Sequence, residues 1–159
     1  MIVAYTDGGA RGNPGPGGYG VRVETENGEL LAELHEPLGL TTNNIAEYRG
    51  LLAALTWATA HGHTALIVRS DSELLVRQMR GEYKVRHPNL KPLHAEAVRL
   101  AARLDRVTFE HVRREANREA DRLANLAMDQ NQNQNQNQNQ DSGFGIQDSG
   151  IANPETGDR

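Results

Sequence analysis

Close to the start of the chain stands the segment Tyr5-Thr6-Asp7-Gly8-Gly9-Ala10-Arg11-Gly12-Asn13-Pro14-Gly15-Pro16-Gly17-Gly18-Tyr19-Gly20. It continues an apolar, β-prone run that begins at residue 2, and such runs usually lie in the middle of a sheet. Asp7 ends this strand and a glycine-rich loop follows. Because glycine lets a backbone approach another surface closely, the loop can press its own N–H and C=O groups against a ligand. The segment predicts either a metal or phosphate site, or a hairpin turn in which Asp7 caps a backbone amide.

Length and composition predict one folded domain, since 159 residues suffice for a core. The chain has no cysteine, which excludes a thiolate metal site and a thiol nucleophile. It shows no basic-then-apolar leader and no apolar run that could cross a bilayer, so we expect a cytoplasmic protein with no membrane partner. The formal net charge of −4 arises from the acids after Met128, and residues 1–128 are neutral. Nucleic-acid binding would therefore depend on the local placement of charge.

Hydrophobic periodicity and turn signals predict an α/β fold of five strands and four helices. We expect the strands over 2–6, 19–24, 30–36, 65–68 and 107–112, and the helices over 46–60, 73–79, 93–104 and 116–128. An Asn-Gly pair at residues 27–28 predicts a hairpin between the second and third strands. The later strands follow helical crossovers. The pattern therefore predicts a five-stranded mixed sheet in which strands one to three are antiparallel and strands four and five lie parallel to strand one.

The C-terminal part of the chain has a different composition. Residues 130–140 alternate strictly between Gln and Asn, and residues 141–159 are rich in Gly, Ser, Asp and Asn. Neither segment has enough apolar surface to offset the entropy lost on ordering. We therefore expect a folded domain over 1–128 and a disordered, Gln/Asn-rich and acidic tail over 129–159.

Four acids stand at ends of the predicted elements: Asp7, Glu47, Asp71 and Asp121. Asp7 and Asp71 end neighbouring parallel strands, which places them side by side. Glu47 lies early in the first long helix and Asp121 early in the last, so both helices can bring a carboxylate to the same edge of the sheet. Singly, each acid also has a structural interpretation as a helix cap, a first-turn acid or an ion-pair partner.

Together, four gathered carboxylates repel one another, and burial adds to the cost. Hard divalent cations remove that cost, and a ligand set made only of oxygen suits Mg²⁺ or Mn²⁺. Two such ions about 4 Å apart are the arrangement used for in-line phosphodiester cleavage. The four acids therefore indicate a two-metal site.

At this point the chain resembles the type 1 ribonuclease H family. The matching segments cover the predicted folded domain and are Tyr5-Thr6-Asp7-Gly8-Gly9, Gly12-Asn13-Pro14-Gly15-Pro16-Gly17-Gly18-Tyr19-Gly20, Thr42-Asn43-Asn44-Ile45-Ala46-Glu47, Ser70-Asp71-Ser72 and Asn117-Arg118-Glu119-Ala120-Asp121-Arg122-Leu123-Ala124. The glycine loop and the Thr-Asn-Asn-x-x-Glu motif are highly specific together, whereas Ser-Asp-Ser alone is weak.

The resemblance implies the ribonuclease H fold and metal-dependent cleavage of the RNA strand in RNA–DNA hybrids. It implies catalytic and metal-binding roles for Asp7, Glu47, Asp71 and Asp121. It also implies contacts to the hybrid from the loop Gly8, Gly9, Ala10, Arg11, Gly12 and Asn13 and from Thr42, Asn43, Asn44 and Asn89. Backbone groups of the loop would contact RNA 2′-hydroxyls, which are reachable in the wide, shallow minor groove.

The chain departs from the family pattern in two places. Many relatives carry a histidine in a longer loop before the last Asp, but the segment 112–117 is short and has none. We expect His111 to be a surface residue, and Arg113, Arg114, Arg118 or Glu115 to substitute for the missing histidine, the arginines as electrostatic helpers. The basic helical protrusion of some relatives is also missing, and the smaller loop over 80–91 replaces it, which predicts a weaker grip on the hybrid.

Three functions remain open from the sequence. The first is a hybrid-specific endoribonuclease, which acts as a monomer. The second is a broader nuclease that also cuts double-stranded RNA because its grip is reduced. The third is a non-catalytic hybrid-binding domain, but such a module would have no need for four mutually repelling carboxylates.

Overall fold

One mixed sheet of five strands forms the centre of the molecule. The computed structural model describes residues 1–144 of the chain. The strands are β1 (Ile2–Ala10), β2 (Gly15–Thr25), β3 (Leu30–Thr41), β4 (Ala65–Ser70) and β5 (Arg106–His111). Their order in the sheet is β3-β2-β1-β4-β5. β1, β2 and β3 pair antiparallel, and β4 and β5 run parallel to β1, which confirms the predicted sheet.

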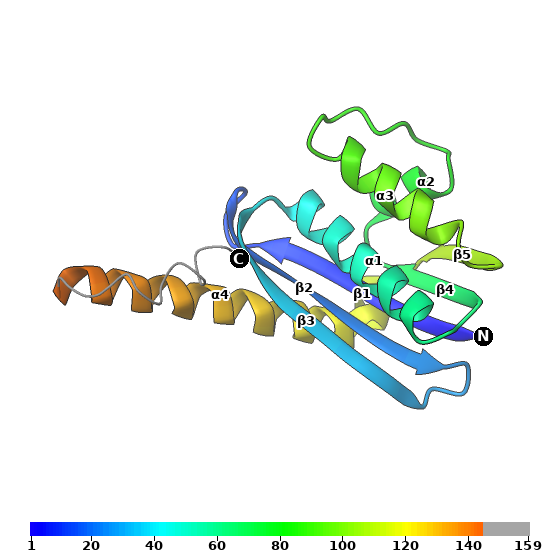
Figure 1. Cartoon of the computed structure of the whole chain (residues 1–159), viewed down its shortest axis with the longest axis horizontal. Helices are drawn as coiled ribbons and strands as arrows, with labels where there is room; N and C mark the ends of the chain where they lie inside the picture. The colour runs from blue at the N-terminus through cyan, green and yellow to red at the C-terminus, as the bar shows by residue number, and fades with distance from the viewer. Residues whose placement is uncertain (145–159) are drawn as a thin grey trace.

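Helices cover both faces of the sheet, as Figure 1 shows. They are α1 (Asn43–Ala60), α2 (Glu73–Met79), α3 (Lys91–Ala101) and α4 (Arg118–Phe144). A short 3₁₀ turn, Arg114–Asn117, leads into α4. The first three helices lie on one face of the sheet and α4 packs on the other (Figure 1). The long connections between β1, β4 and β5 are therefore helical crossovers, as parallel neighbours require.

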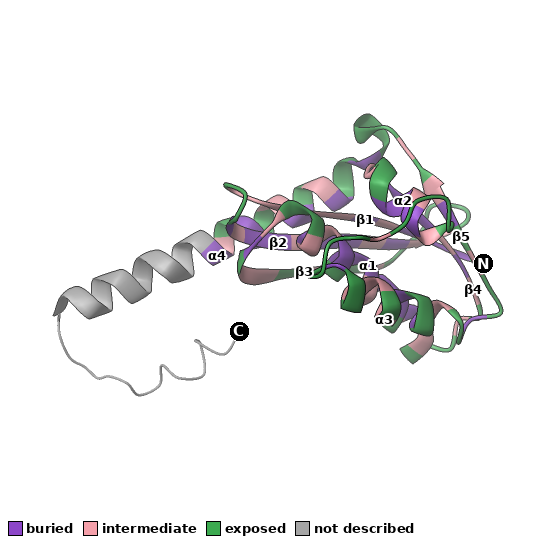
Figure 2. Cartoon of the chain, turned by 90° about the horizontal axis from the view of Figure 1, so that it is seen from above, coloured by how far each residue is buried: buried purple, intermediate pink, exposed green. Residues whose placement is uncertain are grey.

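The hydrophobic core lies between the sheet and α1. Val21 and Val23 of β2 face Leu51 and Leu55 of α1, and each of these side chains is at most 1% exposed. Figure 2 shows buried residues along the inner sides of the strands and helices. Burying one such side chain is worth about 1.5–3 kcal/mol. This apolar layer holds the N-terminal turn of α1 in a fixed place over the sheet.

Two glycines bring both helical layers very close to the sheet at one end. A Cβ atom on Gly8 would lie 2.4 Å from the backbone of Ala46 in α1, and one on Gly20 would lie 2.5 Å from the backbone of Ala120 in α4. Any side chain at these positions would push a helix away from the strands. The glycines therefore allow α1 and α4 to place their first turns on either side of β1.

β1 extends further than the sequence predicts. We expected the strand to end at Thr6, but it continues to Ala10 because its last residues pair with β2 as far as Gly17. The parallel ladder with β4 nevertheless ends at Thr6, which pairs with Ser70. Asp7 is therefore the first residue of β1 beyond the shared ladder.

The last helix also differs from its prediction. We expected it to end at Met128, whereas α4 continues to Phe144. The side chain of Asn131 is 3% exposed, so the helix packs on the sheet beyond residue 128. The predicted domain boundary at 128 and the disorder of the tail stay predictions, and residues 145–159 lie outside the described part of the chain. Among the described residues, no helix is long and apolar enough to cross a membrane.

Candidate active site

Asp7 and Asp71 lie where two parallel strands part. Thr6 and Ser70 form the last pair of the β1–β4 ladder, and the two aspartates follow directly. The next residue orients the side chain of Asp7, since Asp7 Oδ1 accepts a hydrogen bond of 2.9 Å from the N–H of Gly8. The position of these two carboxylates is therefore a consequence of the parallel register, as the sequence predicted.

Glu47 reaches Asp7 and Asp71 from the first turns of α1. Thr42 caps this helix, because its Oγ1 accepts a hydrogen bond of 3.4 Å from the N–H of Ile45. The cap defines where α1 begins, and the missing side chain at Gly8 lets the helix lie directly against β1. Glu47 is thereby placed over the ends of β1 and β4.

Asp121 comes from the first turn of α4. Asn117, which is 1% exposed, precedes this turn and donates a hydrogen bond of 2.9 Å from its Nδ2 to the carbonyl of Thr6. This bond ties the start of α4 to β1 one residue before Asp7. Asp121 therefore lies beside Asp7 although the two residues are far apart in sequence.

The structure brings three of the four predicted carboxylates into one cluster. One carboxylate oxygen each from Asp7, Glu47 and Asp71 lies within 4.8 Å of the other two. Asp121 contacts Asp7 and lines the same cleft, which has a volume of about 390 Å³. The cleft is lined by Asp7, Gly8, Gly9, Ala10, Arg11, Asn43, Asn44, Glu47, Asp71, Arg114, Asp121, Asn125 and Met128.

Burial and repulsion disfavour the charged form of Asp7. Burial raises the pKa of Asp7 from 3.8 to about 8, with further increases from the charge of Asp71 and from a hydrogen bond shared with Asp121. The N–H of Gly8 acts in the opposite direction and favours the carboxylate. Without a cation, the protein would hold Asp7 largely protonated at neutral pH.

The pKa values of Glu47 and Asp71, the two other members of the cluster, are also raised. Burial raises the pKa of Glu47 to about 7, while a hydrogen bond from Ser72 opposes the shift and the charge of Asp71 adds to it. Burial also raises the pKa of Asp71, against the nearby positive charge of Arg114. Such shifts away from ordinary values are typical of functional sites, because structure alone rarely requires like charges to share a cleft.

The donor set fits a divalent cation. All the candidate ligand atoms are carboxylate oxygens, the donors that hard cations such as Mg²⁺ and Mn²⁺ prefer. A bound cation would remove the repulsion that raises the pKa of Asp7 and Glu47. The acidic cluster is therefore consistent with a divalent metal site.

The glycine loop forms one wall of the cleft and is tied to α1. The N–H of Ala10 donates to Asn43 Oδ1 at 2.8 Å, and the N–H of Asn43 donates to Asn13 Oδ1 at 3.1 Å. Within the loop, the N–H of Arg11 donates to the carbonyl of Pro16 at 2.9 Å. The predicted contact residues of the loop and of α1 therefore form one hydrogen-bonded surface beside the carboxylates.

Of the predicted residues outside the acidic cluster, some line the cleft and others lie elsewhere. Of the three predicted helper arginines, only Arg114 lines the cleft, where its Nε lies 3.9 Å from Asp71 Oδ2. Arg118 lines a separate cavity on the α4 face of the sheet, and Arg113 lines neither. Asn89 lies outside the cleft, on the exposed loop before α3, where its N–H donates to His87.

His111 is an exposed residue at the end of β5, as expected. It is paired with Ser70 in the sheet, and its charge lowers the pKa of Asp71. His111 therefore lies close enough to Asp71 to affect its pKa.

Two of the residues that line the cleft were not predicted from the sequence. Asn125 lies one helical turn after Asp121 and donates from its Nδ2 to the carbonyl of Asp121 at 2.9 Å. Met128 follows a further turn along the same face of α4. The i, i+4 spacing after Asp121 was the available signal, since residues four apart share one side of a helix.

Comparisons with known proteins agree with this geometry. A family model described as "Reverse transcriptase-like" matches residues 5–127. The bifunctional protein Rv2228c of Mycobacterium tuberculosis is 50% identical over 129 residues, which cover 80% of this chain and 35% of that protein. The ribonuclease HI of Halobacterium salinarum is 39% identical over 128 residues, which cover 80% of this chain and 64% of that protein.

Solved structures support the same assignment. The N-terminal RNase H domain of Rv2228c is 48% identical with a TM-score of 0.81, and the alignment covers 84% of this chain and 96% of that one. The chain belongs to the type 1 ribonuclease H family. RNase H1 of Halobacterium salinarum superposes with a TM-score of 0.78 at 38% identity, over 81% of this chain and 98% of that one. LC11-RNase H1, solved in complex with an RNA/DNA hybrid, has a TM-score of 0.78 at 44% identity, over 82% of this chain and 98% of that one.

The ribonuclease H region is only part of some of these relatives. The chain spans about a third of the length of Rv2228c and 64% of the length of the Halobacterium protein. Family membership is therefore established for the shared domain.

Proposed function

We propose that this chain is an endoribonuclease that hydrolyses the RNA strand of RNA–DNA hybrids and uses two Mg²⁺ or Mn²⁺ ions. The observation that carries the proposal is the meeting of Asp7, Glu47 and Asp71 within 4.8 Å, beside a glycine-rich segment that lines the same cleft. The related LC11 enzyme was solved with such a hybrid, which supports the substrate class.

In this proposal the four carboxylates hold the cations. Asp7 contacts Asp121 and lies next to Asp71, so it is the residue best placed to share both ions. When bound, the cations would stabilise the charge that develops on the attacking and leaving oxygens of an in-line phosphodiester cleavage. Glu47 and Asp71 complete one side of the site, and Asp121 the other.

The loop Gly8–Asn13 would recognise the RNA strand. The N–H groups of Ala10 and Arg11 already donate within the protein. We therefore assign the contacts with RNA 2′-hydroxyls to backbone carbonyls of the loop, which accept the hydroxyl proton. Because the Oδ1 atoms of Asn13 and Asn43 accept backbone hydrogen bonds, their Nδ2 groups are oriented as donors to the hybrid.

Other residues would hold the flanks of the duplex. Thr42 at the start of α1 would contact a phosphate of the DNA strand, with Asn44 beside it. Asn89 lies further away and would meet the duplex only at a distance from the carboxylates. Arg114 would supply positive charge near the scissile phosphate, since it is the helper arginine that lines the cleft. The monomeric state and the cytoplasmic location stay predictions.

Incubation with matched labelled duplexes tests the proposal. An RNA–DNA hybrid, a double-stranded RNA and a double-stranded DNA would each be treated in Mg²⁺, in Mn²⁺ and in EDTA. We expect cleavage of the RNA strand of the hybrid with either metal and none in EDTA. Hybrid binding without any cleavage would contradict an enzyme and favour the non-catalytic alternative.

One observation keeps a broader nuclease as the second candidate. The described loop between α2 and α3 forms no helix, so the chain has no basic protrusion there to select the hybrid. Cleavage of double-stranded RNA at a rate within about tenfold of the hybrid rate, a difference of about 1.4 kcal/mol in barrier, would support this reading.

A further inference from the structure

The turn of α4 that follows the carboxylates carries a set of polar side chains that the cleavage chemistry does not use. Asn125, Asp129 and Asn131 lie on the helix after Asp121, and all three contact parts of the β1–β2 hairpin. Asn131 lies in the segment that the sequence assigns to a disordered tail. It is nevertheless 3% exposed, and buried amides are retained where they satisfy specific partners.

Asn131 joins two strands at irregular points. Its Nδ2 donates to the carbonyl of Gly17 in β2 and to the carbonyl of Gly39 in β3, each at 2.9 Å. The register of the two strands shifts after Gly17, and Gly39 has a φ of 72°, a left-handed conformation. Both carbonyls therefore lie where the regular ladder is interrupted, and the side-chain amide supplies a donor to each.

Arg11 forms the second connection between the hairpin and α4. Its guanidinium pairs with the carboxylate of Asp129 and donates to Asn125 Oδ1 at 3.0 Å. A second, longer contact of 3.5 Å reaches the backbone carbonyl of Asn125. Because guanidinium is planar and its donors form a rigid fork, these contacts restrict the direction of the side chain and of the loop that carries it.

These two connections hold the loop from the side opposite to α1. On the α1 side, Asn43 holds the loop: its Oδ1 accepts from the N–H of Ala10, and its N–H donates to Asn13 Oδ1. On the α4 side, Asn131 holds the end of the hairpin that returns from the loop, and Arg11 holds the loop itself. The glycine-rich loop is therefore fixed from both sides before any ligand binds.

We infer that Asn131, together with the Arg11–Asn125–Asp129 contacts, positions the Gly8–Asn13 loop for binding of the hybrid. The inference rests on the proposed function for the identity of the ligand. Glycine-rich segments lose much conformational entropy on ordering, so a loop held in place in advance binds its ligand more tightly. The carboxylates are placed by other contacts, the β1–β4 ladder and Asn117, so the chemical step is largely independent of this support.

The decisive variant is Asn131→Ala in the full chain, with Gln130→Ala as its matched control. Gln130 is the neighbouring amide on α4, and no hydrogen bond of its side chain is found among the described residues. Single-turnover cleavage would be measured over a range of hybrid concentrations. We expect the half-saturating concentration to rise about tenfold for Asn131→Ala while the maximal rate stays within about twofold, as loss of pre-organisation predicts.

Hydrogen exchange provides a second readout that is independent of the hybrid. Amides over residues 8–18 should exchange faster in Asn131→Ala than in the parent chain and in Gln130→Ala. Unchanged exchange in this segment would overturn the positioning role, whether or not the hybrid is cleaved. If exchange accelerates but the parent chain neither binds nor cleaves a hybrid, the proposed function fails and the positioning of the loop stands.

Asp129→Asn is a second variant that tests the inference even if Asn131→Ala does not fold. Asp129 is 58% exposed, so its replacement leaves no buried group unpaired. It should raise the half-saturating concentration in the same direction by about twofold to threefold, because one charged contact of Arg11 is lost. A fall in maximal rate at unchanged half-saturation, in either variant, would contradict the inference and point to a role in the chemical step.

Discussion

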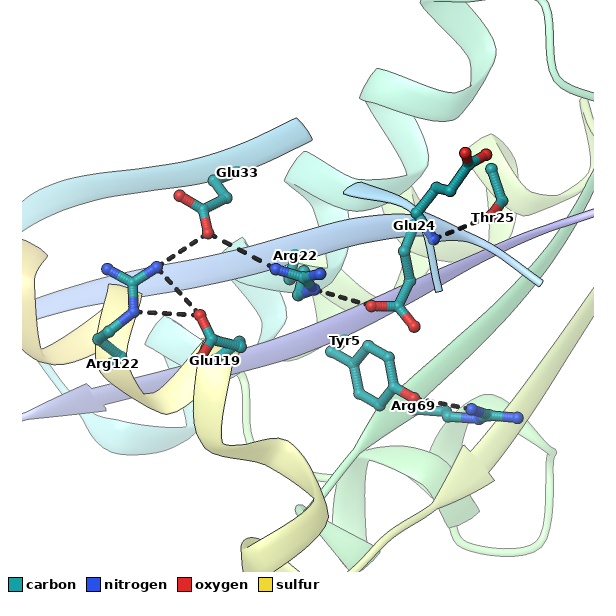
Figure 3. Close-up of polar contacts among 9 residues, drawn as sticks. Tyr5, Arg22, Glu24, Thr25, Glu33, Arg69, Glu119 and Arg122 are labelled. Carbon is teal, nitrogen blue, oxygen red and sulfur yellow. Dashed lines mark hydrogen bonds and ion pairs between the residues drawn. The ribbon is translucent and has the colours of Figure 1, made fainter. Parts of the chain in front are cut away.

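Two groups of charged side chains lie along β1 and have opposite character. Figure 3 shows the first, in which arginines and glutamates alternate from Arg122 to Glu24, with Tyr5 and Arg69 nearby. Arg22 donates to Glu24 at 2.7 Å and Arg122 to Glu33 at 2.8 Å. The second is the acidic cluster at Asp7, two residues further along β1 and on the same side of the strand.

In the first group nearly every charge has an opposite partner. Glu33 lies between two arginines, Arg22 and Arg122, and Arg69 donates to the hydroxyl of Tyr5 at 2.8 Å (Figure 3). In the second group, carboxylates face carboxylates, and burial raises the pKa of Asp7 and Glu47. The charges of the first group therefore stabilise one another, whereas those of the second group repel. A cluster in which buried carboxylates mainly face one another therefore indicates a cation site.

The largest expected effect tests the acidic cluster directly. Asp7→Asn should abolish cleavage while leaving hybrid binding largely intact, because Asp7 is proposed to hold both ions. Cleavage rates would be compared at matched metal concentration, with Glu24→Gln as a control that removes a carboxylate from the paired group. Retention of more than about a tenth of the parental rate, about 1.4 kcal/mol of barrier, would contradict the role of Asp7.

The next effect concerns stability without metal. The pKa of Asp7 is about 8 in the folded protein and near 3.8 when unfolded, so the folded state binds more protons between these values. Stability of the metal-free protein should therefore fall as pH rises from about 4 to about 8. Asp7→Asn removes this penalty and should stabilise the metal-free protein by on the order of 1–3 kcal/mol at alkaline pH.

Melting temperatures in EDTA at about pH 5 and about pH 9 would measure this difference. The advantage of Asp7→Asn should be small at the acidic value and grow toward the alkaline one. Added Mg²⁺ should stabilise the parent chain more than the variant, because a ligand that binds only the folded state raises stability. An equal response of both proteins to pH would show that Asp7 does not experience the predicted repulsion.

A smaller effect should distinguish the arginines near the two groups. Arg114 lines the acidic cleft, whereas Arg118 lines the cavity beside the paired charges. Arg114→Ala should reduce the cleavage rate by about threefold to tenfold, since one exposed charge near a phosphate is worth about 1 kcal/mol. Arg118→Ala should change the rate by less than about twofold. Equal losses in both variants would mean that only the total charge matters.

The smallest effect is expected within the paired group. Glu33→Gln removes the carboxylate shared by Arg22 and Arg122, at a site that is about one-third exposed. Partly exposed ion pairs contribute about 0.2–1 kcal/mol, so urea unfolding should show a loss in this range that shrinks in high salt. A loss above about 2 kcal/mol would show that the paired group is far more important to the fold than its exposure suggests.

Much of the acidic site could be predicted from local signals. Asp7 and Asp71 each follow an apolar strand, and parallel strands place their ends together. Thr42 marks the start of α1, which sets the position of Glu47 one turn later. Asp121 was predicted as well, although it lines the wall of the cleft and lies outside the cluster of three.

The peripheral residues were predicted less well, because their places depend on how elements pack. Arg113, Arg114 and Arg118 lie within six residues of each other, and only Arg114 lines the cleft. The direction of each side chain depends on the path of the 3₁₀ turn, which has no distinctive sequence pattern. Asn125 shares one side of α4 with Asp121 by its spacing, but that side is known to line the cleft only once α4 is packed against β1.

The strand directions, the glycine loop and the three carboxylates of the cluster could be predicted from the sequence, because each follows from apolar periodicity, a cap or a turn within a few residues. The packing of α4 on the sheet beyond Met128 is visible only in the tertiary structure. The composition after Met128 predicts disorder, yet Asn131 is buried against Gly17 and Gly39, residues 114 and 92 positions away. Local composition cannot reveal this contact, since a polar amide becomes favourable to bury only when folding brings unpaired backbone carbonyls to meet it.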